Sequence, residues 1–460
     1  MIGPFRTSPL GLVPKPNADT FQMIQNMSFP CGQPEVASVN NGINSNDFPT
    51  EWGTFDATSL MILSLPPGCI AATFNISAAY YLTPIHPDQQ QHLCVMWEGL
   101  IYIDQAVMFG LASSAGIFGC VADMLVAIYK AAGFHPLLKW VDDFFIVCLP
   151  NQSWSEQDFM DLTGAIGVPW STKKTHLFSS LQRYIGFDWN LASCTVAIPP
   201  NKLSWVLDLL NCWLTPDSSF SSRKTAGLHG KLVHLSCIFP LICPFLRSIS
   251  LFLLQFKSFC TKLHVPLPLA ANLSWIHFLI HNLPNQMPLL SHQAVDLHWW
   301  GDASTSFGIG VVIADHWAIW KWSSGFRVGP NLDFNIGWAE AIVVALDLCL
   351  AIHLNLFYLS DPSHSIFLVC SDNLGVVSVL NKGRSRSKET NRTLKHIFLL
   401  QACHHIHLQA RHVLHFDYKS RHQTLWVTRV HQGSRVWIWI WVMPVGLILT
   451  DSNVESTVKV

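Results

Sequence analysis

The stretch Lys139–Val147, which reads KWVDDFFIV, decides how the rest of the chain is interpreted. Its two adjacent carboxylates, Asp142 and Asp143, lie in an apolar and aromatic run that predicts a buried β-hairpin. Adjacent like charges inside a core are costly unless a cation or another partner compensates them. The stretch therefore predicts a hard divalent ion such as Mg²⁺, because oxygen ligands suit such ions and a pair about 4 Å apart serves phosphoryl transfer. The alternative is a turn whose aspartates face solvent.

Composition allows two to four domains and sets few limits on function. The chain has 460 residues, of which 12% are charged and 50% apolar, and its formal net charge is -1. This balance gives no support for nucleic-acid binding, although the basic run Lys382–Lys388 would suit either a hybrid-binding face or a nuclear signal. The 13 cysteines form no CxxC pair, which favours reduced thiols in an intracellular protein, in the nucleus or the cytoplasm.

We expect neither a secretory signal nor a membrane span. The apolar run 235–256 is interrupted by Pro240, Pro244 and Arg247, and the run 436–449 is too short to span easily.

The first 198 residues mix strands and helices without strict βαβ alternation, which favours the α+β class. The pattern predicts a strand pair flanking 14–19, a strand at 71–81, a hairpin at 97–102, helices at 110–132 and 158–166, and a strand with a tight turn at 184–189.

The pattern turns helical from Pro199 to about Leu290, with 221–234 and 273–283 the clearest helices. A compact α/β domain is predicted next, with strands at 297–302, 309–313, 317–322 and 366–371, a helix at 338–354, and helices after Asn373 and Asn391. The pattern breaks down after Asp417, and no fold is assigned to the tail.

Several short motifs follow one another in a fixed order, and as a set they are far more specific than any one of them. In chain order they are SPLG at 8–11, FNISAAY at 74–80, MFGLASSA at 108–115, WVDD at 140–143, YIGF at 184–187, WGDAS at 300–304, WAE at 338–340 and CSDN at 370–373. From about Gly3 to His412 the chain thus resembles the reverse transcriptase and ribonuclease H segment of retrotransposon polyproteins, most like the type abundant in mushroom-forming fungi.

The resemblance implies an α+β multidomain fold, a right-hand polymerase (fingers, palm, thumb) followed by a ribonuclease H-like α/β domain. The implied domains are fingers and palm (1–198), a helical thumb or connection (199–292), the ribonuclease H-like domain (293–417) and an irregular tail (418–460). The implied partners are RNA template, DNA primer, RNA–DNA hybrid and deoxynucleoside triphosphates, with Mg²⁺ or Mn²⁺ as cofactor. The oligomeric state is left open.

In the polymerase half, the resemblance makes Asp142 and Asp143 catalytic metal ligands. The first palm position, a carboxylate in the family, is Asn75 here, and an amide is uncharged and a poor Mg²⁺ ligand. Since losing one well-placed electrostatic group costs about 10²-fold or more, we expect impaired polymerase activity. The fingers also depart, with Gln22 and Asn26 where an Arg and an Asp are usual.

Four residues are implied nucleotide contacts. Lys15 would contact phosphate, and Tyr80 would stack under the incoming sugar. Phe109 and Gly110 belong to the motif that contacts template and nucleotide. The alternatives are a solvated surface lysine and a plain core tyrosine.

In the second half, Asp302, Glu340 and Asp372 resemble the core carboxylates of a ribonuclease H, as catalytic residues and metal ligands for hydrolysis of the RNA strand of a hybrid. Taken singly, Asp302 could be a turn residue and Glu340 a charge at a helix N-terminus.

His412 resembles the family's mobile proton carrier, or is one surface histidine among 22. The fourth carboxylate is expected to be lost, because Asp417 comes too early and Arg421-His422 stand in its place. These departures suggest a degenerate copy, and they leave open a non-catalytic relic or a domesticated nucleic-acid-binding protein.

Overall fold

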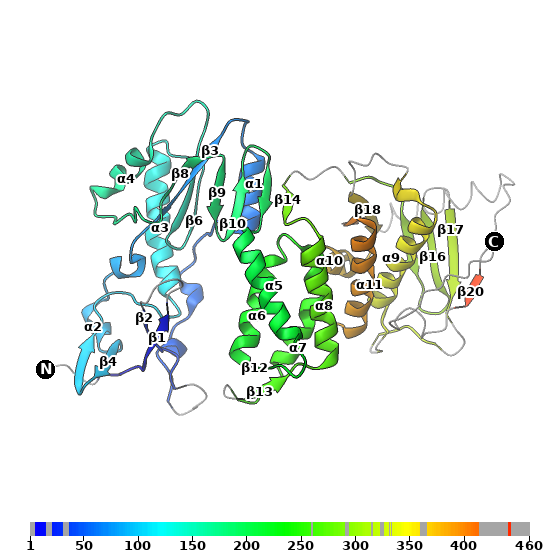
Figure 1. Ribbon diagram of the computed structural model, residues 1–460, viewed down its shortest axis with the longest axis horizontal. Coiled ribbons are helices and arrows are strands. Elements are labelled where there is room, and N and C mark those ends of the chain that lie inside the picture. The colour runs from blue at the N-terminus through cyan, green and yellow to red at the C-terminus, as the bar shows by residue number, and fades with distance from the viewer. Residues whose placement is uncertain are drawn as a thin grey trace. The chain divides into compact units, whose positions relative to one another are not determined.

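The computed structural model consists of two compact units, Met1–Pro199 with Met287–Leu290, and Pro200–Gln286 with Ser291–Val460 (Figure 1). Helices and strands are mixed in both, which confirms the α+β class. Lys15, the side chain of Gln22, Asp417 and nearly all of the tail fall outside the described residues. The structure describes residues 5–14, 21–30, 36–258, 261–289, 294–313, 316–322, 326–330, 332, 334–358, 366–413 and 440–442.

The centre of the first unit is an antiparallel sheet with the strand order β6-β7-β3-β8. The predicted aspartate hairpin is confirmed as β6 and β7, and β7 is buried over most of its length because both faces are covered. The strand expected at 71–81 is shorter than predicted, since it ends at Asn75 and the chain then turns into a 3₁₀ segment, Ala79–Leu82. The bounds are Ile70–Asn75 (β3), Leu137–Trp140 (β6), Asp143–Cys148 (β7) and His176–Ser179 (β8).

An aromatic core joins this sheet to helices α3 (Ser114–Ala131) and α4 (Glu156–Gly164). The ring of Tyr129 stacks on that of Phe159 at 3.9 Å, and the Tyr129 hydroxyl donates to the Phe159 carbonyl at 2.8 Å. Both helices were predicted, but α3 begins four residues later than expected.

The remaining elements of the first unit are short. The strand pair around 14–19, the hairpin at 97–102 and the hairpin at 184–189 are confirmed. A second sheet has the order β14-β11-β10-β9. The bounds are Leu10–Pro14 (β1), Phe21–Gln25 (β2), Phe55–Leu63 (α1), Pro87–Gln90 (α2), Cys94–Trp97 (β4), Leu100–Ile103 (β5), Leu181–Tyr184 (β9), Phe187–Asn190 (β10), Thr195–Ala197 (β11) and Gln286–Pro288 (β14).

The second unit begins with a group of helices, as the pattern predicted. The run 235–256 is broken at Pro240, where a 3₁₀ turn separates two helices. The bounds are Pro200–Leu214 (α5), Ser222–Leu235 (α6), Cys243–Leu253 (α7) and Leu267–Asn282 (α8), with a small strand pair of Ser219–Ser221 (β12) and Lys262–His264 (β13).

The rest of the second unit is an α/β arrangement. Strands β15, β16 and β17 pair antiparallel, β18 pairs parallel with β19, and Val295 bridges in parallel to Phe367 of β18. The bounds are Trp300–Ala303 (β15), Gly308–Ile313 (β16), His316–Lys321 (β17), Ile336–His353 (α9), Ile366–Ser371 (β18), Leu374–Lys382 (α10), Lys388–His404 (α11), His407–His412 (β19) and Ile440–Val442 (β20), which pairs with β17.

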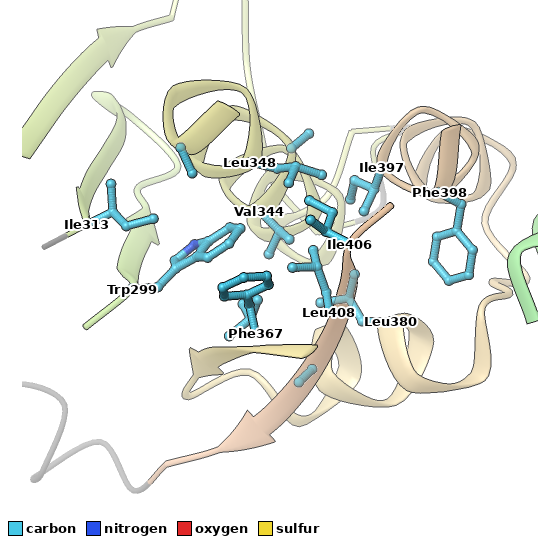
Figure 2. Close-up of a cluster of buried hydrophobic side chains, with 14 of the residues drawn as sticks. Trp299, Ile313, Val344, Leu348, Phe367, Leu380, Ile397, Phe398, Ile406 and Leu408 are labelled. Carbon is cyan, nitrogen blue, oxygen red and sulfur yellow. The ribbon is translucent and has the colours of Figure 1, made fainter. Parts of the chain in front are cut away.

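The core of this α/β part lies between α9, α11 and the strand pair β18 and β19. Figure 2 shows Trp299 and Phe367 beside Val344 of α9, with Ile397 and Phe398 contributed by α11. Because this core draws on β16, α9, β18, α10, α11 and β19, it fixes where the end of β18 lies relative to α9.

Helix α11 also contacts the helical part of the same unit. The Asn391 side chain donates to the carbonyl of Pro244 at 2.9 Å and accepts from the backbone N–H of Ser385. The Arg247 guanidinium donates to the carbonyl of Ser385 at 2.8 Å. These bonds fix the loop before α11 on α7.

Two helices, α3 and α9, are long and apolar enough to cross a membrane when only length and composition are considered. Both place side chains in a core: Phe118 and Tyr129 of α3 are fully buried, as is Leu348 of α9. Packing within the second unit explains the apolar character of α9, most of which is buried.

Candidate active sites

The first site lies where the end of β3 meets the start of the antiparallel strand β7. Register places Asn75, the last residue of β3, opposite Asp143, the first residue of β7. The Asn75 amide nitrogen donates to Asp142 Oδ2 at 2.7 Å and to Asp143 Oδ1 at 2.7 Å. The structure therefore brings Asn75 together with Asp142 and Asp143, which lie 67 and 68 residues further along the chain.

The turn that carries the two carboxylates is constrained on both sides. Val141 adopts φ 52°, a left-handed conformation that is rare for a β-branched residue and typical of functional sites. The backbone N–H of Ile76 donates to the Asp142 carbonyl at 2.9 Å. The position of the Asp142 side chain is thus set by the backbone as well as by Asn75.

Lys139, three residues before Asp142, anchors the hairpin to α3. Its side chain is only 4% exposed, and its ammonium group lies 2.9 Å from Asp123 Oδ1 of α3 and 2.6 Å from Thr50 Oγ1. It also lies 4.4 Å from the ring centre of Trp52, a cation–π distance. A buried lysine with these three partners fixes β6 on α3.

Burial raises the pKa of Asp143, and the neighbouring charge of Asp142 raises it further. The hydrogen bond from Asn75 opposes this rise, as do the positive charges of Lys174 and His176. The segment before Lys174 reaches the site through Ser171, whose backbone N–H donates to the Asn75 carbonyl at 2.8 Å.

The expected nucleotide contacts are partly assembled at the same place. The rings of Tyr80 and Phe109 lie 4.8 Å apart, and burial together with the charge of Asp142 raises the pKa of Tyr80. Gly110 adopts φ 113°, and a Cβ there would meet the Gln25 carbonyl oxygen, so this position requires glycine. Lys15 lies outside the described residues.

The residues at this first site do not fit a divalent ion as they stand. Mg²⁺ requires oxygen ligands at about 2.0–2.1 Å, whereas an amide N–H₂ group faces both carboxylates. The other amide atom, Asn75 Oδ1, is buried and has no hydrogen-bond partner within the described part of the chain.

The second site is centred on Glu340, near the start of α9. Its Oε1 accepts a hydrogen bond from the backbone N–H of Ala303 at 3.2 Å, directly after Asp302 on β15. Burial raises the pKa of Glu340 to about 8, with further contributions from Asp302 and, more weakly, Asp372. Asp302 on β15 and Asp372 after the end of β18 therefore both act on Glu340 of α9.

His412, the last residue of β19, lies beside this cluster. One of its ring nitrogens is 3.2 Å from the backbone carbonyl of Asp372. The donor set would suit a hard ion, yet among the residues that the structure describes no three His, Cys, Asp or Glu side chains are arranged to hold one. The positions considered for a fourth carboxylate, Asp417 and Arg421-His422, lie outside the described residues.

No family model matches the chain, and no curated protein matches it. Among solved structures it is similar to the foamy viral protease-reverse transcriptase. In complex with RNA/DNA hybrid, that protein shows 14% identity and a TM-score of 0.45, over 99% of this chain and 53% of that chain. The dRH form with double-stranded DNA shows 15% identity and a TM-score of 0.45, over 88% and 65%.

A third structure, the same viral protein with double-stranded DNA, shows 16% identity and a TM-score of 0.43, over 95% of this chain and 78% of that chain. The chain thus spans between about half and two thirds of the first two relatives. The chemistry of the two sites is therefore inferred from the side chains of this chain and not from these similar structures.

Sequence reasoning missed the cations around the first site. Lys139 was quoted as part of the hairpin, but nothing local shows that Asp123 on α3 would compensate it. Lys174 and His176 lie just before and at the start of β8. The pairing of β8 with β3 brings them close to Asp143 only after folding. A basic residue inside an apolar strand, as at Lys139, is the one signal that could have drawn attention to this group.

Proposed function

We propose that this chain is a reverse transcriptase-like nucleic-acid enzyme, related to retroelement proteins, in which RNA-strand hydrolysis is retained and DNA synthesis is impaired. The observation that carries the proposal is the cluster of Asp302, Glu340 and Asp372, gathered from three separate elements of the second unit. A buried carboxyl group whose pKa is raised by neighbouring carboxylates, as for Glu340, is typical of sites that bind divalent cations and phosphodiesters.

The second unit supplies the residues for hydrolysis. No three acidic or His or Cys side chains of the described residues converge on one point in this structure. Asp302, Glu340 and Asp372 are nevertheless the residues that would hold Mg²⁺ or Mn²⁺, which would activate water and polarise the phosphate. The Ala303 N–H orients the Glu340 carboxylate. His412, whose ring lies beside the Asp372 backbone, would carry a proton to or from the leaving oxygen.

The first unit supplies a polymerase-type palm that lacks one charge. In the proposed palm, Asp142 and Asp143 would serve phosphoryl transfer between a DNA primer and a deoxynucleoside triphosphate on an RNA template, with Tyr80, Phe109, Gly110 and Lys15 as the nucleotide contacts that the resemblance implies. Asn75 in place of a carboxylate removes the third anionic ligand, so that synthesis is slow or absent.

Hybrid cleavage tests the retained activity. A labelled RNA–DNA hybrid with Mg²⁺ or Mn²⁺ is expected to be cut in its RNA strand, and Asp372→Asn is expected to reduce the rate by about 10²-fold or more. Asp208→Asn, which removes an exposed charge from α5 in the same unit, serves as the matched control and should leave the rate unchanged. Equal rates for both variants would refute the assignment of Asp372.

Primer extension tests the impairment. On a homopolymer RNA template, the unsubstituted chain is expected to extend a DNA primer poorly, and Asn75→Asp is expected to raise the rate by about 10²-fold. Efficient extension by the unsubstituted chain would contradict the proposal.

The second candidate function is a non-catalytic nucleic-acid-binding protein. It is favoured by the Asn75 amide between the palm carboxylates and by the lack of a three-ligand metal group among the described residues. In that case the hybrid would be retained on a filter with the protein, but neither cut nor extended.

A further inference from the structure

The two hydrogen atoms of the Asn75 amide satisfy one carboxylate each. Its nitrogen lies 2.7 Å from both Asp142 Oδ2 and Asp143 Oδ1, so one NH₂ group bridges the adjacent acids. An ion shared by the same two oxygens would have to occupy the space between them. The amide nitrogen already lies there, and with Asn75 only 3% exposed it is shielded from water.

We propose that the Asn75 amide replaces the divalent cation at the palm, so that the Asp142 and Asp143 carboxylates are held together by an internal donor and do not take up a metal ion. This rests on the proposed interpretation of the two aspartates as a polymerase-type pair. It is independent of hydrolysis in the second unit.

The orientation of the amide and the presence of an ion exclude one another. With the NH₂ group facing the acids, each carboxylate receives a charge-assisted hydrogen bond. If the amide turned over, its Oδ1 would face two carboxylate oxygens, and only a cation or a proton would hold three acceptors together. The Nδ2 group would then occupy the place where Oδ1 now has no partner among the described residues.

Other groups around the two aspartates also make an ion less necessary. Lys174 and His176 both act on Asp143, and the backbone N–H of Ile76 anchors Asp142 through its carbonyl. Together with the amide, Lys174 and His176 offset part of the negative charge of the half-buried carboxylates. The site is therefore complete without a cofactor.

Mn²⁺ binding to the full chain tests the proposal. Asp302→Asn and Asp372→Asn are introduced first, so that the second unit contributes no binding, and Mn²⁺ uptake is followed by titration calorimetry together with the unfolding temperature. The chain with Asn75 is expected to show no Mn²⁺ binding that depends on Asp143. Asn75→Asp is expected to gain a site at least tenfold tighter, with an unfolding temperature that rises with Mn²⁺.

The matched control is Asn46→Asp, which adds the same charge at an exposed position of the same unit and should gain no site. If Asn75→Asp does not fold, Asn75→Ala removes the donor without adding charge and is expected to gain weaker Mn²⁺ binding. Mn²⁺ binding by the Asn75 chain that is lost with Asp143→Asn would overturn the proposal, because the amide would then act as a ligand. If the unsubstituted chain does not cut the RNA–DNA hybrid, the proposed function is refuted, but the inference about Asn75 is not.

Discussion

Asp347 is an acidic residue in the core of the second unit. It lies in α9 with 0% exposure, and neither carboxylate oxygen has a hydrogen-bond partner within the described structure. A Cβ on Gly301 would approach its Oδ2 to 2.8 Å, so the neighbouring strand is tightly packed against it. Burial raises the pKa of Asp347 well above its ordinary value, against a smaller opposing effect of Trp299.

Asp347→Asn is expected to remove a pH dependence of stability. Because the folded pKa is raised, the folded state holds a proton that the unfolded chain releases above about pH 4. The contribution of this proton to the free energy of unfolding is therefore fully present below that pH. It is lost as the pH rises towards the folded pKa of Asp347. Urea unfolding should show the variant to be about 1–3 kcal/mol more stable than the parent at pH 8, with little difference at pH 4.

The control for this measurement is Asp208→Asn, which removes an exposed carboxylate from the same unit. It should follow the parent at every pH. If Asp347→Asn also loses stability in parallel with the parent between pH 4 and pH 8, the buried carboxyl is not the source of the dependence.

The β6–β7 hairpin shows how an element is held by one buried charge. Lys139 is 4% exposed while its partner Asp123 is 43% exposed, so the two ends of the ion pair are not equivalent. Removing the lysine leaves an aspartate that water can still solvate. Removing the aspartate leaves a buried ammonium group with only Thr50 and Trp52.

The hairpin therefore predicts an asymmetry between two substitutions. Asp123→Asn is expected to lower the free energy of unfolding by about 3 kcal/mol and Lys139→Met by less, because stranding a buried charge costs more than exposing a surface one. Calorimetric unfolding of the full chain measures both, with the exposed Lys130→Met as control. A larger loss for Lys139→Met than for Asp123→Asn would contradict this account.

Elements with a strong local pattern could be predicted from the sequence, and those that depend on distant partners could not. The alternation and aromatic content of 139–147 determine the hairpin, and the ordered motifs bring Asn75 to it. Helix α1 was missed, because its apolar residues show little one-sided periodicity and its position depends on packing. The direction of the Asn75 amide was also not predictable, since it depends on which atoms face it after folding.

On the scale of the whole second unit, the helical and α/β parts share polar contacts that neither can satisfy alone. Asn391 bonds to the Pro244 carbonyl and Arg247 to the Ser385 carbonyl. Gly383 lies so close to Cys243 that a Cβ would meet that side chain at 2.8 Å. The two parts are thus packed as one body.

Truncation tests this coupling. A fragment of residues 200–460 is expected to unfold in one transition, whereas 291–460 should unfold at a clearly lower temperature because Asn391 loses its acceptor in a buried position. Restoring the second fragment's unfolding temperature to that of the first by Asn391→Leu would support the argument, since it removes the unpaired amide. Equal unfolding temperatures for the two unsubstituted fragments would refute it.

The bond between Asn391 and Pro244 also bears on how such a chain can be recombined over time. Recombination at residue 291 would join this helical part to a different α/β part that lacks a side chain to donate to the Pro244 carbonyl. The recombinant protein would therefore be less stable. A crossover near residue 200 keeps donor and acceptor on the same inherited piece. Related sequences should therefore have exchanged the region after residue 200 by recombination as one block.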